Sequence, residues 1–162
     1  MKLLVIGDGR HGKDTVCKLM HIGHDMTFRS SSDFANERAV FPFLKGKYNY
    51  TSAAECYNDR INHREEWKDL IRQYNGDDPG RLVRELLEDS DIYCGLRHRE
   101  EFEASKHLFD FILWIDASDR LPPEKSNDLT VLDADLVIDN NGNLYDLRRS
   151  IDSTMDAIFR MV

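Results

Sequence analysis

The sequence predicts a three-layer α/β fold, in which a parallel sheet of about five strands carries helices on both faces. Two observations lead to this prediction. Short apolar runs alternate with segments of helical periodicity along most of the 162 residues, which is the pattern of β-α-β units. Residues 2–7, KLLVIG, form a continuous apolar run of the kind found in strands buried on both faces. No repeat, low-complexity stretch or domain-sized linker interrupts the pattern, so one domain over residues 1–162 is expected.

The first expected unit consists of a strand, a glycine-rich loop and a helix. The apolar run 2–7 ends at Gly7, where the loop begins. After the loop, apolar residues recur at helical spacing over 13–23, and Gly23 is expected to terminate this helix. A second, short strand is expected over 26–32.

The central part of the chain is expected to be mainly helical. Pro42 limits any helix within 33–44. Apolar and aromatic side chains that recur every three or four residues predict one helix from Ser52 to Tyr74, with Ser52 and Glu55 forming a capping box. The remaining expected elements are, in order, a breaker (75–80), a helix (81–89), a strand (91–95), a helix (96–107), a strand (109–116), a loop (116–128), a strand (135–140) and a closing helix (141–162).

The composition indicates a soluble globular protein, with 41% hydrophobic and 32% charged residues. The formal net charge of −8 argues against nucleic acid as the default partner, but it is compatible with a small polyanion in a local basic pocket. We find neither an apolar stretch of membrane length nor a signal peptide. The three scattered cysteines suit buried, reduced thiols. A cytoplasmic protein without a membrane partner is expected, and a homodimer is left open.

Residues 7–15, GDGRHGKDT, match the phosphate-loop pattern G-x-x-x-x-G-K up to its last position. Glycines let the backbone turn tightly, so that successive N–H groups point at phosphate oxygens, and the following helix adds the positive end of its dipole. Lys13 is expected to reach the β- and γ-phosphates of ATP. The residues expected to bind the nucleotide here are Gly9, Arg10, His11, Gly12, Lys13, Asp14 and Thr15.

The position after Lys13 departs from the phosphate-loop pattern. The residue there normally carries a hydroxyl that holds Mg²⁺, whereas this chain has Asp14 and places the hydroxyl at Thr15. A carboxylate is a hard oxygen ligand, so Asp14 is the predicted Mg²⁺ ligand. Asp14 could alternatively stabilise only the first helical turn through the dipole, and the two roles are compatible. Thr15 is expected near the α-phosphate, and His11 is expected to face solvent or nucleotide.

This loop resembles that of the bacteriophage-type deoxynucleoside monophosphate kinases, which ends in Gly-Lys-Asp-Thr. Two further stretches are similar to the same family, namely 92–118, IYCGLRHREEFEASKHLFDFILWIDAS, and 133–151, DADLVIDNNGNLYDLRRSI. The resemblance implies a P-loop kinase fold, ATP and Mg²⁺ as cofactors, and a nucleoside monophosphate as the second substrate.

The chain departs from that family just before an arginine that follows the third strand. The family has an acidic residue there, whereas this chain reads YCGLR over 93–97. A second carboxylate on the metal side is therefore not assigned by the resemblance, and Asp33, Asp91 and Asp116 are the candidates.

Arg97 and Asp33 join Lys13 as the expected catalytic residues. Arg97 follows the third strand at the carboxyl edge of the sheet, where sites in parallel sheets lie, and its guanidinium can bind phosphate bidentately. The alternative is a surface ion pair with Glu100 or Glu101. Asp33 follows the second strand and could contact the sugar or base of the acceptor, or act as an acid–base or metal-side group.

A helical substrate-side insert is expected around 45–89, by resemblance to kinases in which such an insert closes over the acceptor. Arg60 and Arg64 are four residues apart and would share one helix face there, either as substrate contacts or as exposed ion-pairing residues. A short lid-like loop is expected around 117–130, where Arg120 is the candidate that closes on ATP. Two prolines in this loop would equally suit a plain rigid connection.

The predicted function is ATP- and Mg²⁺-dependent phosphorylation of a (deoxy)nucleoside monophosphate. A second hypothesis keeps this chemistry but takes a 5-hydroxymethyl-pyrimidine in DNA as the acceptor, against which the acidic charge argues mildly. A third hypothesis, from another class, is a P-loop NTPase or a nucleotide-binding regulatory protein. A fourth is a phosphate-binding module without turnover.

Overall fold

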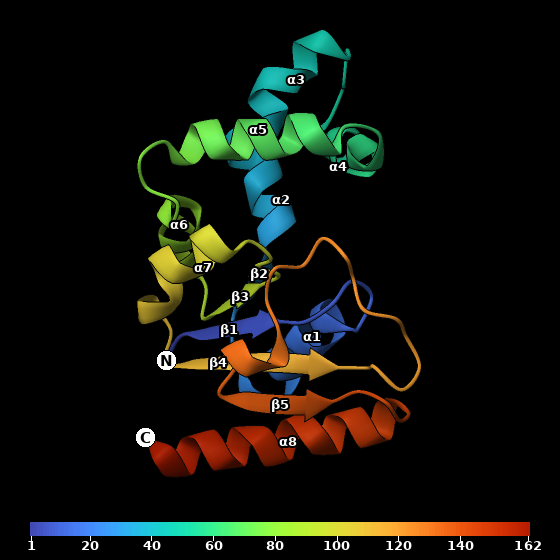
Figure 1. Cartoon of the computed structure of the whole chain (residues 1–162), viewed down its shortest axis with the longest axis vertical. Helices are drawn as coiled ribbons and strands as arrows, with labels where there is room; N and C mark the ends of the chain where they lie inside the picture. Colours follow the sequence, from blue (N-terminus) through green and yellow to red (C-terminus); the bar gives the residue numbers. More distant parts are fainter.

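The computed structural model describes all residues, 1–162, and contains one sheet of five parallel strands in the order β2-β3-β1-β4-β5 (Figure 1). A strand lies at each of the five positions predicted from the sequence, so the α/β prediction is confirmed. The strands are β1 (Leu3–Ile6), β2 (Phe28–Ser30), β3 (Ile92–Cys94), β4 (Phe111–Asp116) and β5 (Leu136–Asp139). The α-helices are α1 (Lys13–His24), α2 (Ser31–Ala35), α3 (Phe41–Lys47), α4 (Ala53–Asn58), α5 (Arg64–Asn75), α6 (Arg81–Asp89), α7 (Arg99–Ser105) and α8 (Leu144–Met161). A π-helical turn covers Asn36–Val40, and 3-10 turns cover Asp59–Asn62, Lys106–Leu108 and Val131–Asp133.

Helices pack on both faces of the sheet and give the three layers. Side chains alternate along β1, so that Leu3 and Val5 join the core under α1 and α8. Leu4 and Ile6 join the core on the opposite face, which α2, α6 and α7 cover. All four residues are fully buried, and the strand that leads into the glycine-rich loop is therefore anchored at the centre of the molecule. No helix of this fold combines the length and the apolar character needed to cross a lipid bilayer.

The segment between β2 and β3 forms the helical insert. It begins at Ser31, earlier than the predicted range 45–89, and Figure 1 shows α3, α4 and α5 standing beyond the β2 edge of the sheet. Pro42 lies in the first turn of α3, where its missing N–H is tolerated, so it does not interrupt the helical course as the sequence suggested. A small core of its own holds this part together: Ala39, Val40, Leu44, Cys56 and Trp67.

The predicted single helix from Ser52 to Tyr74 is wrong, because the chain leaves the helix at Asp59. The Asp59 carboxylate accepts hydrogen bonds from the Tyr50 hydroxyl at 2.5 Å, the Asn62 amide at 2.7 Å and His63 Nε2 at 3.0 Å. Such local side-chain bonds compete with helix continuation and favour the 3-10 turn that separates α4 from α5.

Two predicted helix ends are corrected in detail. The helix α1 runs past Gly23 and ends at Asp25, whose φ of 53° is in the left-handed region that aspartate tolerates better than most residues. Ser52 caps α4 as predicted, since its Oγ accepts from the Glu55 N–H at 3.2 Å. In a complete capping box the Glu55 side chain would accept from the N–H of Ser52. Here it accepts instead from the N–H of Thr51, at 2.7 Å.

The cap of α8 gives a first stability prediction. Asn143 accepts from the N–H groups of Tyr145 at 2.8 Å and Asp146 at 3.1 Å, and Asp146 accepts from the Asn143 N–H at 3.1 Å. Replacing Asn143 with alanine should lower the free energy of unfolding by about 1 kcal/mol. This corresponds to about 2–4 °C in a thermal unfolding experiment. Asn58→Ala is the control, because the exposed Asn58 side chain makes no hydrogen bond and should not lower the melting temperature.

Candidate functional site

The glycine-rich loop lies at the carboxyl edge of the sheet, at a point where the chain connections diverge. From β1 the chain leads through α1 to β2 on one side, whereas from β4 it leads to β5 on the other side. Ligands of open parallel sheets bind at such a switch point. The loop 7–12 therefore occupies the position where the sequence predicts the phosphate site.

The glycines of this loop allow its compact path. Gly7 has φ +147°, and a Cβ there would lie 2.7 Å from the carbonyl oxygen of Ile115 on β4. Gly12 has φ +97° and directly precedes α1. Arg10 is exposed and also has a positive φ of 66°, which is uncommon for a non-glycine residue. No side chain caps the N-terminus of α1, so its first N–H groups remain suited to an anion.

Lys13 folds back onto the loop that precedes it. Its Nζ donates to the carbonyl oxygens of Gly7 and Asp8, each at 2.8 Å. Burial, and secondarily the positive charge of Arg97, lower the pKa of Lys13. The second of these causes shows that the Arg97 charge acts on Lys13.

Arg97 comes from the segment after β3 and pairs with a residue that the sequence analysis missed. Its Nη1 donates to Glu124 Oε1 at 2.6 Å, whereas Glu100 and Glu101, the predicted alternatives, do not pair with it. The other carboxylate oxygen, Glu124 Oε2, is buried without a hydrogen-bond partner. It lies 2.7 Å from where a Cβ on Gly9 would be. The Glu124 carboxylate thus covers the loop and faces both cations.

His11 occupies a different environment from the predicted one. It is 1% exposed rather than open to solvent or nucleotide. Its Nδ1 accepts from the N–H of Ala117 at 3.2 Å and its Nε2 donates to the carbonyl of Pro122 at 3.2 Å, which together define the neutral Nε2–H tautomer. Its own carbonyl accepts from Asn140 Nδ2 at 2.8 Å. His11 therefore ties the glycine-rich loop to its neighbours, and its side chain is not available to a ligand.

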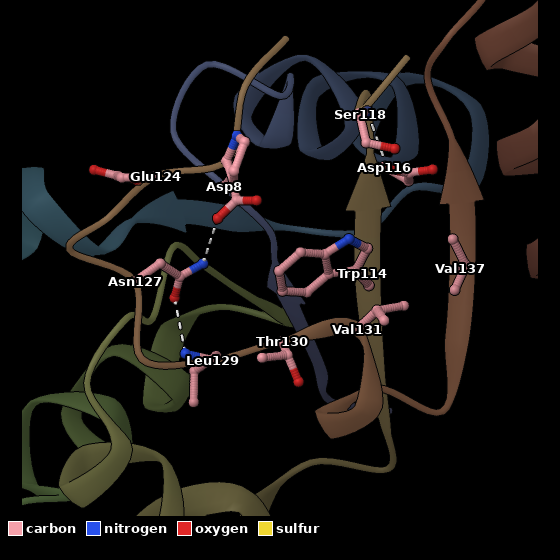
Figure 2. A pocket seen from close by; sticks show the side chains of 11 residues that line it. Asp8, Trp114, Asp116, Ser118, Glu124, Asn127, Leu129, Thr130, Val131 and Val137 are labelled. Carbon is pink, nitrogen blue, oxygen red and sulfur yellow. Dashed lines mark hydrogen bonds between the residues drawn. The ribbon is translucent and has the colours of Figure 1, made fainter. Parts of the chain in front are cut away.

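Residues 117–130 form a loop without regular secondary structure, as predicted, and this lid-like loop is tied to the site at several points. Besides the His11 contacts, Asn127 Nδ2 donates to Asp8 Oδ1 at 3.1 Å (Figure 2). The Asp128 N–H donates to the Arg97 carbonyl at 3.0 Å. Arg120, the predicted lid arginine, is exposed and donates from Nε to the Asn140 carbonyl at 2.8 Å, so it lies across the turn after β5.

Asp14 and Thr15 are both exposed in the first turn of α1. Asp14 Oδ1 accepts from the Cys94 thiol at 3.4 Å, and the hydrogen bond with Cys17 together with burial raises the pKa of Cys94, which keeps it a donor. No group of three or more His, Cys, Asp or Glu side chains is arranged to hold a metal. Mg²⁺ needs only one or two protein carboxylates when substrate phosphates and water complete its shell, so the exposed Asp14 carboxylate fits that ion.

The three candidates for a second metal-side carboxylate lie in different places. Asp91 precedes β3 at the amino edge of the sheet, where it binds Thr27, so that candidate is wrong. Asp116 ends β4 at the carboxyl edge, and a hydrogen bond from Ser118 is the main cause that lowers its pKa. Asp33 lies in α2 and lines a cavity of the insert. The sequence did not suggest Glu124, whose carboxylate pairs with Arg97 and lies against Gly9 of the loop.

Arg60 and Arg64 do not share a helix face, because they lie on separate elements. Arg60 belongs to the 3-10 turn, where its guanidinium stacks 3.8 Å from the centre of the Tyr57 ring and donates to the Tyr57 carbonyl at 2.9 Å. Arg64 begins α5 and is exposed. The structure therefore separates this pair from the cluster formed by Lys13 and Arg97.

Two cavities border these residues. The larger, of about 450 Å³, lies beside the glycine-rich loop, and Figure 2 shows the Trp114 indole facing it. Its lining residues are Asp8, Trp114, Asp116, Ser118, Pro123, Glu124, Asn127, Leu129, Thr130, Val131 and Val137. The smaller, of about 230 Å³, lies in the helical insert. Its lining residues are Asp33, Asn36, Glu37, Ala53, Ala54, Tyr57 and Asn58.

A half-buried carboxyl on α7 gives a pH-dependent stability prediction. Burial, and secondarily the charge of Glu100, raises the pKa of Glu101 on α7 from 4.5 to about 7. The folded state then binds this proton more tightly than the unfolded state, so the free energy of unfolding falls as the pH rises through this interval. Glu101→Gln should leave stability at pH ~5 nearly unchanged and raise it by up to about 3 kcal/mol at pH ~8. Urea denaturation at both pH values measures this, with the exposed Glu88→Gln as the control that should show no such difference.

Comparison with protein-family models and with curated proteins identifies no relative of this chain. The chain matches no protein-family model, and a search of curated proteins finds no significant match. The resemblance to the phage-type kinases therefore rests on the residues quoted from the sequence.

Proposed function

We propose that this protein is an ATP- and Mg²⁺-dependent phosphotransferase that phosphorylates a (deoxy)nucleoside monophosphate. The observation that carries the proposal is that Lys13 and Arg97 both lie at the glycine-rich loop, at the switch point of the sheet: Lys13 through its bonds to Gly7 and Asp8, and Arg97 through Glu124, which lies against Gly9. Two cations beside a glycine-rich loop and an uncapped helix N-terminus suit the triphosphate of a nucleotide better than any neutral ligand.

Each residue has a distinct role in this reaction. The loop N–H groups and the N-terminus of α1 would bind the phosphates, and Lys13 and Arg97 would stabilise the charge on the transferring phosphoryl group. Asp14 is the residue that would hold Mg²⁺, which would neutralise negative charge on the nucleotide phosphates. The acceptor is itself an anionic phosphate oxygen, so the reaction needs positioning and charge stabilisation more than a strong general base.

The second substrate would bind on the side of the helical insert. Asp33 and the smaller cavity lie on that side, in α2 and α4, which follow the edge strand β2. Arg120 lies on the other side, across the turn after β5, and would be the lid residue that closes on ATP. The two substrates would therefore approach Lys13 and Arg97 from opposite sides, which suits in-line transfer.

A coupled assay of ADP release tests the proposal. The enzyme is supplied with ATP, Mg²⁺ and, one at a time, dAMP, dGMP, dCMP, dTMP, dUMP and 5-hydroxymethyl-dUMP. We expect one or two monophosphates to stimulate ADP release well above the rate with ATP alone. Equal rates with and without every monophosphate would contradict the proposal. A parallel reaction with DNA that contains 5-hydroxymethyl-pyrimidine shows whether the acceptor lies in a polymer instead.

A further inference from the structure

The smaller cavity contains a buried hydrogen-bond acceptor that has no partner. Asn36 is 3% exposed, and its Nδ2 donates to the Ala53 carbonyl at 2.8 Å. Because a carbonyl can only accept, this bond fixes which end of the amide carries nitrogen and which carries oxygen. The remaining atom, Asn36 Oδ1, is buried and makes no hydrogen bond. A buried acceptor without a donor is unfavourable, and a bound water or ligand that supplies the donor relieves it.

The backbone at Asn36 has an unusual conformation. Asn36 begins the π-helical turn that joins α2 to α3, and such turns are rare and occur frequently at functional sites. The turn places Asn36 between α2 and α4, whose residues form the walls of the cavity. Tyr57 forms part of one wall, where its hydroxyl lies 3.2 Å from Ser32 Oγ and its ring is covered by Arg60.

Two of the other polar side chains of the cavity are acceptors only, whereas Asn58, which also lines it, carries an amide that can donate as well as accept. Asp33 and Glu37 contribute carboxylates, and Glu37 already pairs with Arg29. Asn36 Oδ1 and Asp33 are thus the acceptors left for a ligand, and Asp33 makes no side-chain hydrogen bond of its own. The cavity volume of about 230 Å³ suits one heterocyclic ring system rather than a whole nucleotide. A ligand that presents N–H groups would fit this lining, whereas one that presents carbonyl oxygens would face like partial charges.

We infer that this cavity holds the base of the acceptor nucleotide and that Asn36 selects a base with an exocyclic amino group. This inference rests on the proposed function and specifies its substrate class. Adenine, cytosine and guanine each carry an amino group that can donate to Asn36 Oδ1, and guanine adds a ring N–H beside it. Thymine and uracil carry a single ring N–H between two carbonyl oxygens, so they leave Asn36 Oδ1 poorly satisfied and direct an oxygen toward Asp33.

The test is equilibrium binding of monophosphates in the absence of ATP, measured by titration calorimetry, so that it does not depend on phosphoryl transfer. For the wild-type chain, at least one of dAMP, dGMP and dCMP should bind roughly tenfold or more tightly than dTMP and dUMP, since a site built for a hydrogen bond discriminates strongly against analogues that lack it. Equal or tighter binding of dTMP and dUMP, or no binding of any amino-bearing monophosphate, would overturn the inference.

Two variants separate recognition from a purely structural role of Asn36. Asn36→Leu removes the acceptor and the bond to Ala53, whereas Asn36→Asp keeps an acceptor, loses the donor to Ala53 and adds a negative charge that also favours N–H donors. We expect the leucine variant to lose the preference for amino-bearing bases and the aspartate variant to retain it. If the aspartate variant loses the preference as well, Asn36 acts by holding Ala53, and the inference is wrong. If the ADP-release assay shows turnover without any preference among bases, this result would support the proposed function and contradict the inference about Asn36.

Discussion

Replacing Lys13 with alanine is expected to lower kcat for monophosphate-dependent ADP release by at least roughly 100-fold, the loss seen when one charge-stabilising donor is removed from a transition state. Lys13 Nζ donates to the carbonyl oxygens of Gly7 and Asp8, and burial, followed by the charge of Arg97, lowers its pKa. The two hydrogen bonds keep the ammonium group at the glycine-rich loop, where the β- and γ-phosphates would lie. Initial-rate measurements at saturating ATP and acceptor provide kcat directly.

The matched control for this variant is Lys18→Ala. Lys18 lies on the same helix α1 and is exposed, so its removal changes the net charge equally without touching the loop. We expect its kcat to stay within about twofold of the wild-type value, as for surface substitutions away from a site. A Lys13 variant that folds normally and retains full kcat would show that the loop does not serve phosphoryl transfer.

The position of the glycine-rich loop could be predicted because its signal is local. The apolar strand, the glycines and the helix that follows are contiguous in the sequence. The structure accordingly places the glycine-rich loop between β1 and α1. The alternation of strands and helices likewise predicted the parallel sheet and both helical layers. These features depend on neighbours along the chain, which a single sequence reports directly.

The contacts that cover the loop could not be predicted in the same way. The partner of Arg97 lies 27 residues away at Glu124, and His11 binds Ala117, which is 106 residues away. Neither spacing has a sequence signature, because loop paths decide which distant side chains meet. The break of the helix at Asp59 was missed for a related reason, since helical periodicity does not show where a carboxylate will bind neighbouring groups.

Replacing Glu124 with glutamine is expected to tighten ATP binding by roughly tenfold, or about 1.4 kcal/mol. The Glu124 carboxylate pairs with Arg97 at 2.6 Å and lies against Gly9, where it opposes the charge that phosphates need. An incoming nucleotide must displace this carboxylate and take over its partner. Glutamine keeps the shape and leaves an oxygen for Arg97, but it removes the negative charge. The interaction with Arg97 that an incoming nucleotide must break is therefore weaker. Titration calorimetry with ATP measures the change.

The same measurement distinguishes two roles of Glu124 if it is made with and without Mg²⁺. Displacement of the carboxylate by phosphate predicts tighter binding in both conditions, because the effect arises from charge around Arg97 and Lys13. Glu124 Oε2 is buried without a partner, however, and an oxygen of this kind can also become a metal ligand when ATP brings Mg²⁺. In that case glutamine would weaken the binding of Mg²⁺-ATP, whereas metal-free ATP would bind equally well or more tightly.

The control for this measurement is Glu88→Gln, which removes an equal charge from the exposed face of α6 and should change neither binding constant. Tighter binding in both conditions would therefore identify Glu124 as a competitor for the phosphate position, and weaker binding of Mg²⁺-ATP alone would identify it as the second metal-side carboxylate.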